Sequence, residues 1–159
     1  MSAPVFTTMG LLVAMTFASS AVARPAPRAP KAEPSATGGA SVQLQKANDQ
    51  YDNADFERSA KLAATLARIK GPVTHQAELL AGKSYLALGE AEHAIPYLRA
   101  ASNAPAWEGS PEAAYRLGVA YKAVGLNDLA AFEFQKYLAF YPQDQRAQRA
   151  RDQLATLKQ

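Results

Sequence analysis

The sequence predicts an all-α fold: a solenoid of helix-turn-helix repeats in which three helix pairs are followed by a C-terminal capping helix. Two observations support this fold class. From Ser41 to Gln159 the apolar residues recur at helical spacing, and no run of alternating β-branched residues indicates a strand. Within this region, two stretches superpose without a gap when one is shifted by 36 residues. A fixed period of this length is typical of solenoids built from helix pairs.

Residues 1–23 are expected to be a secretory signal peptide that is cleaved after Ala23. They carry no charged side chain, Met9–Ala18 has the length of an apolar signal core, and Ala21 and Ala23 fit a small-residue cleavage site. The mature protein would then be periplasmic or secreted. The alternative is an uncleaved segment that anchors the chain in the inner membrane, since about 20 apolar residues can span a bilayer. This is the only membrane contact that we expect.

Residues 24–40 are expected to form a flexible linker that separates the N-terminus from the folded domain. They contain four prolines and two glycines among alanines and charged residues. Such a composition buries too little apolar surface to offset the entropy lost on ordering. The folded domain should therefore comprise residues 41–159.

Three repeats are expected within this domain, at about 41–74, 75–108 and 111–144. The second and third copies match at five positions with identical spacing, four of them identical and the fifth a large apolar residue in both. These are Gly82, Tyr85, Gly89, Ala94 and Leu98 in one, and Gly118, Tyr121, Gly125, Ala130 and Phe134 in the other. The first copy is placed by aligning Tyr51 with Tyr85, 34 residues later, which puts Asn48 and Asp55 where the other copies have glycine.

The glycines have two expected roles. Gly125 ends the first helix of its pair, because glycine adopts the left-handed conformation without a steric penalty. Gly118 lies inside that helix, where glycine costs about 0.5–1 kcal/mol relative to alanine. We expect it, together with Ala130, to let the two helices approach closely and to accommodate the rings of Tyr121 and Phe134.

The repeat resembles the tetratricopeptide repeat family over residues 41–142. Its residue pattern is also similar to repeats of exported bacterial cell-envelope proteins. The resemblance implies a non-enzymatic scaffold whose first helices line a concave groove for a peptide or partner protein. Some members hold a C-terminal carboxylate in this groove with a clamp of basic residues and asparagines. Gln45 and Asp49 stand where that clamp would begin, so we do not expect this type of ligand.

A capping helix is expected at about 143–158. Its apolar residues form one stripe that can cover the last repeat, while the other face meets water, as solenoid ends require. The stripe consists of Ala147, Ala150, Leu154 and Leu157. Arg146, Arg149 and Arg151 are expected on the solvated face; an acidic partner is the alternative.

Composition excludes several classes of function. From Ser41 onward 14 Lys and Arg oppose 13 Asp and Glu, so we expect no nucleic-acid partner, which would need clustered cations. The chain has no cysteine, which excludes disulfides and thiolate metal sites. Its two histidines are 18 residues apart, and its carboxylates are scattered. We therefore expect no metal, no cofactor and no enzymatic activity.

The groove residues are expected at i, i+4 and i+7 of each first helix, adjacent to its core face. The alternative is that the apolar ones only pack against neighbouring helices. The candidates are Gln45, Asp49, Asp52, Leu79, Lys83, Leu86, Tyr115, Val119 and Lys122. The expected function is protein binding through this groove in a periplasmic or envelope assembly. The alternative function is a structural role, in which the convex face or the capping helix mediates self-association.

Overall fold

Seven α-helices form the part of the chain that the computed structural model describes, residues 36–157, and this part contains no strand. Their bounds are α1 Ala36–Asp52, α2 Phe56–Arg68, α3 Thr74–Ala87, α4 Ala91–Asn103, α5 Ser110–Ala123, α6 Asn127–Phe140 and α7 Ala147–Thr156. The expected signal peptide and residues 24–35 of the expected linker lie outside the described residues. Among the described helices, none has the length and apolar character needed to cross a membrane.

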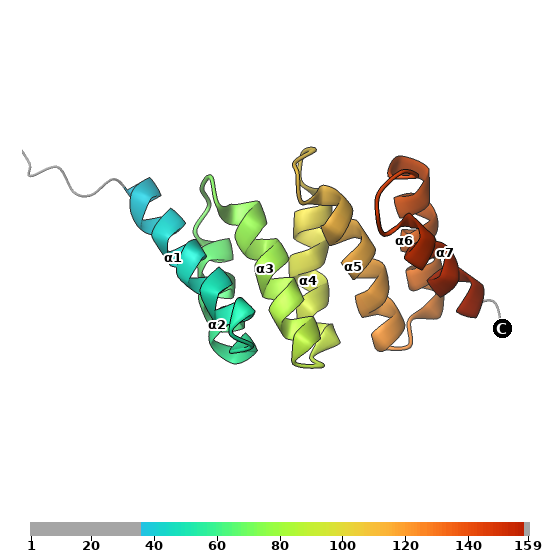
Figure 1. Ribbon diagram of the computed structural model, residues 1–159, viewed down its shortest axis with the longest axis horizontal. Helices are drawn as coiled ribbons and strands as arrows, with labels where there is room; N and C mark the ends of the chain where they lie inside the picture. Colours follow the sequence, from blue (N-terminus) through green and yellow to red (C-terminus); the bar gives the residue numbers. More distant parts are fainter. Residues whose placement is uncertain (1–35, 158–159) are drawn as a thin grey trace, which may run out of the picture. The chain divides into compact units, whose positions relative to one another are not determined.

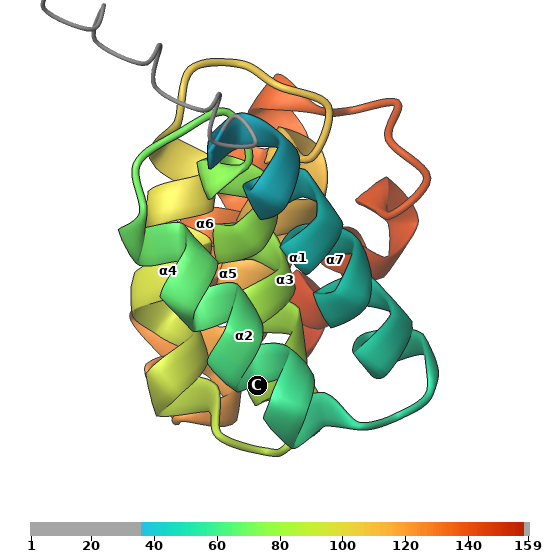
Figure 2. The same ribbon diagram turned by 90° about the vertical axis from the view of Figure 1, so that its left-hand side faces the viewer.

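The helices pack as three antiparallel pairs followed by α7, in the order of the sequence (Figure 1). Each helix contacts its neighbours in the chain, and α3 also contacts both α1 and α5. Viewed along the stack, α2 and α4 lie on one side while α1 and α7 lie on the other (Figure 2). We call the surface of α1, α3, α5 and α7 the first-helix face, and that of α2, α4 and α6 the second-helix face. The predicted all-α repeat architecture is thus confirmed.

Large side chains from the second helices fill the space inside the third pair. Phe134 and Tyr137 of α6 are fully buried and pack in one cluster with Leu98, Leu117 and Tyr121. A second cluster joins α1, α2 and α3 and consists largely of leucines and alanines. The two clusters give each helix pair a continuous apolar seam, which is the main source of stability in a solenoid.

The predicted close contact at Gly118 is confirmed. A Cβ placed on Gly118 would lie 2.8 Å from the Phe134 ring, and one on Gly82 would lie 2.4 Å from Leu98. Both distances are too short for any side chain. Glycine therefore stands inside these two helices because the facing second helix contributes a large buried residue at that level.

The first pair has a different register from the one that the tyrosine alignment predicted. Gly89 and Gly125 have φ values of +78° and +77°, and the residue in this conformation between α1 and α2 is Ala54, with φ 60°. The amides of all three donate to the carbonyl three residues earlier. Ala54 is thus the counterpart of Gly89, 35 residues before it, and the predicted counterpart Asp55 instead caps α2 by accepting from the Arg58 amide.

This register explains the missing glycine in α1. The counterpart of Gly82 becomes Ala47, which is fully buried, and the residue facing it at the level of Leu98 becomes Ala63, also fully buried. A small residue on the second helix leaves room for a methyl group on the first, so alanine suffices. The alignment on Tyr51 was one residue out because the period here is 35 and not 34.

Two boundaries also differ from prediction. Helix α1 begins at Ala36, so residues 36–40 are helical and not part of a linker; Ala40 packs against the second cluster, which supports the added turn. Helix α7 begins at Ala147, four residues later than predicted. The preceding turn is closed by the Asp144 carboxylate, which accepts the backbone amide of Arg146 at 2.8 Å.

Candidate functional site

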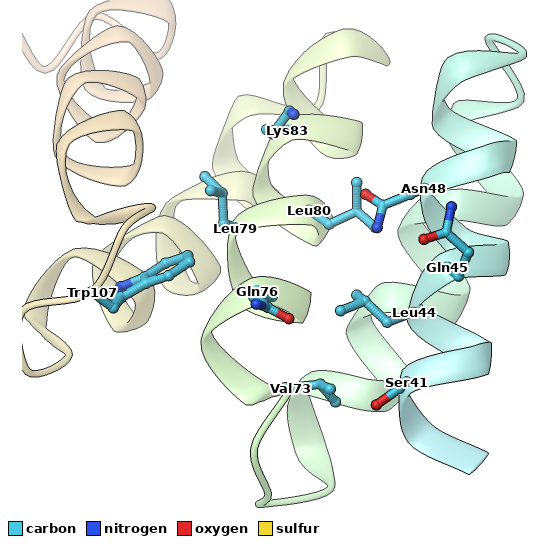
Figure 3. A pocket seen from close by; sticks show the side chains of 10 residues that line it. All are labelled: Ser41, Leu44, Gln45, Asn48, Val73, Gln76, Leu79, Leu80, Lys83 and Trp107. Atoms are coloured by element: carbon cyan, nitrogen blue, oxygen red, sulfur yellow. The ribbon is translucent and has the colours of Figure 1, made fainter. Parts of the chain in front are cut away.

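A groove of about 410 Å³ lies between α1 and α3 on the first-helix face. Figure 3 shows side chains of α1 opposite those of α3, with Trp107 on the far side of α3. The floor is apolar and the rim is polar. The lining residues are Ser41, Leu44, Gln45, Asn48, Val73, Gln76, Leu79, Leu80, Lys83 and Trp107.

The two helices contribute equivalent positions to this groove. With the 35-residue register, Ser41, Leu44 and Asn48 of α1 correspond to Gln76, Leu79 and Lys83 of α3, and all six line it. Of the predicted site residues, Gln45, Leu79 and Lys83 are brought together here. Leu79 has only 9% of its surface exposed and belongs to the first core cluster, so it packs against neighbouring helices while its remaining surface lines the groove.

The other two residues predicted on α1 lie beside the groove. Asp49 is exposed and accepts a 2.9 Å hydrogen bond from Nε2 of Gln45. Asp52 is exposed near the end of α1. The one-residue shift in register places Tyr51, rather than Asp52, at the position of Leu86, and the Lys83 ammonium lies 4.7 Å from the centre of its ring.

The residues predicted on the third first helix face other helices. The Tyr115 ring is half-buried against Phe134 and Tyr137 of α6, with ring centres 5.9 and 5.8 Å away. Val119 packs against the same core cluster, as does Leu86 of α3. The Lys122 ammonium donates to Gln153 at 2.8 Å and to Thr156 at 2.7 Å, both on α7. The capping helix therefore takes up the polar contact that Lys122 was predicted to offer a ligand.

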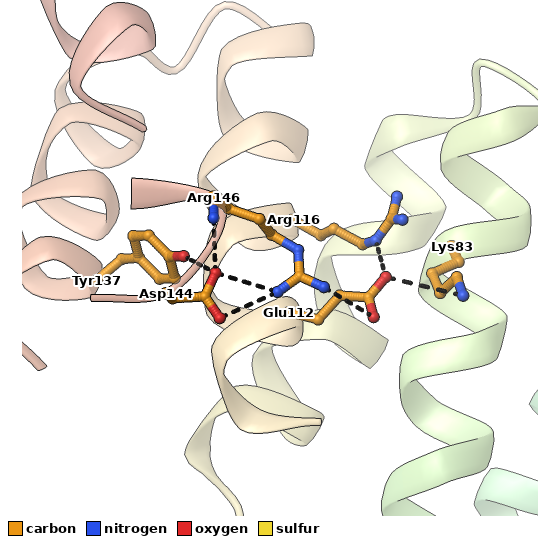
Figure 4. A network of polar contacts seen from close by, with 6 residues as sticks. All are labelled: Lys83, Glu112, Arg116, Tyr137, Asp144 and Arg146. Atoms are coloured by element: carbon orange, nitrogen blue, oxygen red, sulfur yellow. Dashed lines mark hydrogen bonds and ion pairs between the residues drawn. The ribbon is translucent and has the colours of Figure 1, made fainter. Parts of the chain in front are cut away.

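An ion-pair network runs from the groove toward α7 (Figure 4). The Glu112 carboxylate accepts from Nε of Arg116 at 2.7 Å and lies 3.7 Å from the Lys83 ammonium and 3.5 Å from the Arg146 guanidinium. Burial opposes ionisation of Glu112, but the Arg116 hydrogen bond and the three positive charges lower its pKa below the ordinary value. Glu112 is thus the common counterion of three cations from α3, α5 and the turn before α7.

The outer end of this network is the turn at Asp144. Its carboxylate accepts from the phenol of Tyr137 and from the amide and guanidinium of Arg146. Burial opposes its ionisation, but these hydrogen bonds lower the pKa of Asp144, while burial and the bond to Asp144 raise that of Tyr137. Arg146, predicted on a solvated face, is therefore paired with Asp144 and Glu112 of the same chain, whereas Arg149 is exposed.

A second hollow of about 410 Å³ adjoins the groove, and the two share Gln76 and Trp107. It extends over Glu112, Asp144 and Arg146 to the start of α7. The indole of Trp107 is held in place by a 3.0 Å hydrogen bond from Nε1 to the carbonyl of Ala101, and its backbone amide donates to the Ser110 hydroxyl. The first-helix face thus offers one extended surface with a fixed aromatic ring at its middle.

The chemistry of this surface suits an extended polypeptide. The side-chain amides of Asn48 and Gln76 each carry donors and an acceptor, and neither side chain forms a hydrogen bond with the described residues. The apolar floor offers contact area for side chains. Residues 36–157 bring together no three His, Asp or Glu side chains that could hold a metal ion.

Sequence reasoning missed Asn48, Gln76, Trp107 and the Glu112 network. Gln76 and Glu112 stand 36 residues apart, so the repeat itself marks them as equivalent, and the correct first register would have marked Asn48. The ion pairs of Lys83 and Arg146 with Glu112 join residues 29 and 34 positions apart, and no local pattern indicates them.

Comparison with known proteins finds a similar fold in a solved structure but no match by sequence. No family model matches the chain, and no curated protein resembles it in sequence. Among solved structures, the Arabidopsis OM64 TPR domain superposes with a TM-score of 0.63 at 18% sequence identity, covering 75% of this chain and 96% of that one. The match confirms the tetratricopeptide repeat architecture that the spacing of Gly82 and Gly118 predicted.

Proposed function

Since the chain has the tetratricopeptide repeat fold, typically that of a protein-interaction scaffold, we propose that it binds an extended segment of a partner protein in the groove between α1 and α3. The proposed role is non-enzymatic. One observation carries the proposal: the side-chain amides of Asn48 on α1 and Gln76 on α3 both line the groove above an apolar floor. Neither amide has a hydrogen-bond partner in residues 36–157. Amides of this kind can bond the main chain of any extended peptide, while Lys83 and Trp107 add selectivity.

The proposed setting is a periplasmic or cell-envelope assembly. Its support is the sequence of residues 1–23, which has the uncharged apolar core and small-residue cleavage site of an export signal. The proposed partner is another exported protein or the periplasmic part of a membrane protein.

The groove is tested by photocrosslinking in cells. A photoreactive phenylalanine analogue at Gln45, which is exposed and lines the groove, is expected to yield a discrete adduct with a partner protein. The adduct should decrease at least about fivefold when Asn48→Ala is added, because removal of a bond worth about 1 kcal/mol weakens binding by that factor. Mass spectrometry of the adduct identifies the partner.

Arg149 provides the matched control, because it is exposed on α7 and lines none of the hollows described above. The analogue at Arg149 is expected to give no such adduct. Recovery of the same partner from Arg149 but not from Gln45 would refute binding in the groove. Tyr115 is unsuitable for this experiment because its ring packs against α6.

A second candidate function is self-association through the second-helix face. Three large apolar side chains of α6 are exposed there: Leu129 at 45%, Phe132 at 60% and Phe140 at 71%. Their spacing of three and eight residues puts them on one side of the helix. Exposed apolar patches of this kind commonly mark protein interfaces.

Sedimentation equilibrium distinguishes the two functions. If α6 mediates self-association, the wild-type chain is a dimer whose dissociation constant rises at least about tenfold in Phe132→Asp, because the charge would be buried in the interface. Gln76→Ala on the first-helix face should leave the equilibrium unchanged. A monomeric wild-type chain at all accessible concentrations would rule out the second candidate.

A further inference from the structure

A hollow of about 460 Å³ lies on the second-helix face, between α2 and α4. We call it the outer hollow. It is lined mainly by apolar surface, and its principal side chains are Arg68, Glu78, Tyr85, Glu92, His93 and Tyr97. The groove between α1 and α3 contains none of these residues, so the outer hollow is a separate surface.

Three rings form the centre of the outer hollow. Tyr85 and Tyr97 are stacked, with ring centres 5.7 Å apart and planes 18° from parallel. The His93 ring lies on α4, 5.6 Å from Tyr85. Both tyrosines are half-buried, and neither phenol hydroxyl forms a hydrogen bond with the described residues. Their packing therefore leaves two unused hydroxyl donors beside a flat aromatic surface.

Pro96 and Glu92 of α4 form part of the same wall. Proline has no amide hydrogen, so the carbonyl of Glu92 has no donor four residues later in α4. The Glu92 carboxylate is exposed and forms no ion pair or hydrogen bond with residues 36–157. The α4 rim thus carries one exposed carboxylate that has no ion-pair partner among these residues.

The other charged groups of the hollow are already paired or lie across it. Glu78 is 3.1 Å from His75, and Glu90, next to the hollow, is 3.2 Å from His93. Arg68 stands on the opposite rim, at the end of α2. The α4 rim is therefore acidic, and a ligand that places a cation there gains a charge-assisted hydrogen bond.

From this arrangement we propose that the outer hollow binds a proline-containing, basic, extended segment of a partner protein. A polyproline II segment exposes carbonyl acceptors and flat prolyl rings, and it fits grooves lined by aromatic residues. The prolyl rings lie against Tyr85 and Tyr97, whose hydroxyls donate to the segment's carbonyls. A lysine or arginine of the segment binds the Glu92 carboxylate.

The test measures fluorescence anisotropy with the full chain and a fluorescein-labelled peptide of sequence Pro-Pro-Lys-Pro-Pro-Arg-Pro-Pro, which does not occur in this chain. Saturable binding is expected, with an affinity about tenfold weaker in Tyr97→Ala. Glu92→Arg should weaken it by a similar factor, because the exposed rim would then repel the basic peptide. Val42→Ala, which shortens an exposed apolar side chain of α1 outside the hollow, should leave the affinity unchanged.

Three results would overturn the proposal. They are an absence of binding up to about 1 mM peptide, equal binding of a peptide with alanine in place of every proline, and equal affinity in wild type and Glu92→Arg. The last variant changes an exposed side chain, so it keeps the test valid even if Tyr97→Ala fails to fold. Gln76→Ala separates this site from the groove between α1 and α3, since it should not alter the affinity here.

The occupant is tested separately, because residues 24–34 of this chain also contain prolines and basic residues. If a partner protein supplies the bound segment, replacing Pro25, Pro27, Pro30 and Pro34 of this chain by alanine leaves the affinity for the labelled peptide unchanged. An affinity that rises about tenfold in this variant would mean that the chain's own segment competes for the hollow, and it would overturn the assignment to a partner.

Discussion

Replacement of Gly118 by leucine is expected to lower the free energy of unfolding by about 1–3 kcal/mol, the usual cost of overpacking a well-filled core. A Cβ at this position lies 2.8 Å from the Phe134 ring, and Phe134 is fully buried, so the ring has no space to move into. Urea denaturation followed by circular dichroism measures the change. An unaltered midpoint would refute the close contact between α5 and α6.

Two further variants show whether the cause is steric. Gly39 also lies inside a helix, but a Cβ there meets nothing within 4 Å; Gly39→Ala should stabilise the domain by about 0.5–1 kcal/mol through helix propensity alone. Phe134→Ala removes the ring that Gly118 accommodates. The double variant Gly118→Leu, Phe134→Ala should therefore be more stable than the sum of the single changes predicts, because the leucine fills part of the vacated space.

Glu112→Gln is expected to destabilise the domain by about 1.5–3 kcal/mol at pH 7, the range for a lost hydrogen bond to a charged group. The glutamine keeps the shape of the side chain but leaves Lys83, Arg116 and Arg146 without their shared counterion. These three cations converge from different parts of the fold, so their repulsion adds to the loss. Urea denaturation at low salt measures the effect.

The same variant should change the pH dependence of stability. The folded-state pKa of Glu112 lies below its ordinary value of 4.5, so the unfolded chain binds the proton more readily. The stabilising contribution is complete above pH 4.5 and is lost as the pH falls through the lowered pKa. The difference between wild type and Glu112→Gln should therefore shrink as the pH is lowered from 7 to below the ordinary pKa.

Glu57 supplies the control for both measurements. It forms an ion pair with Lys61 at 2.6 Å, but both side chains are about 70% exposed, and such surface pairs contribute little to stability. Glu57→Gln should leave the midpoint unchanged at either pH. A Glu112→Gln variant that behaves in the same way would mean that the network is no more than a surface feature.

The repeats that carry a strong residue pattern were predicted well. Gly82 and Gly118 identified the fold, because a glycine inside a helix at a fixed period requires a close neighbour, and the structure shows that neighbour to be Leu98 or Phe134. The first repeat lacks both glycines, and alignment on Tyr51 misplaced its register by one residue. That single shift accounts for the prediction of Gln45, Asp49 and Asp52 where the structure aligns Leu44, Asn48 and Tyr51 with their counterparts.

The candidate site depended on tertiary structure to a greater degree. The repeat pattern indicates which helices are equivalent, but it does not indicate that α7 engages Lys122 or that Tyr115 turns toward α6. The sequence also predicted that Arg146 lies on a solvated helix face, because no pattern links this residue to Glu112, 34 residues earlier. The structure pairs the two across the first-helix face.

By itself, the sequence determined the helical repeat, the 36-residue period between the second and third copies, and the two turns at Gly89 and Gly125, since local backbone preferences and side-chain volume at fixed spacing decide these features. Only the tertiary structure decided that some polar side chains have no partner within residues 36–157, among them Asn48 and Gln76 in the groove and Glu92 at the outer hollow. The physical reason is that a polar side chain becomes available to a ligand only when the helices packed around it leave its hydrogen-bonding groups unused. That outcome depends on residues distant in the chain, such as Glu112, which pairs with Lys83 and Arg146.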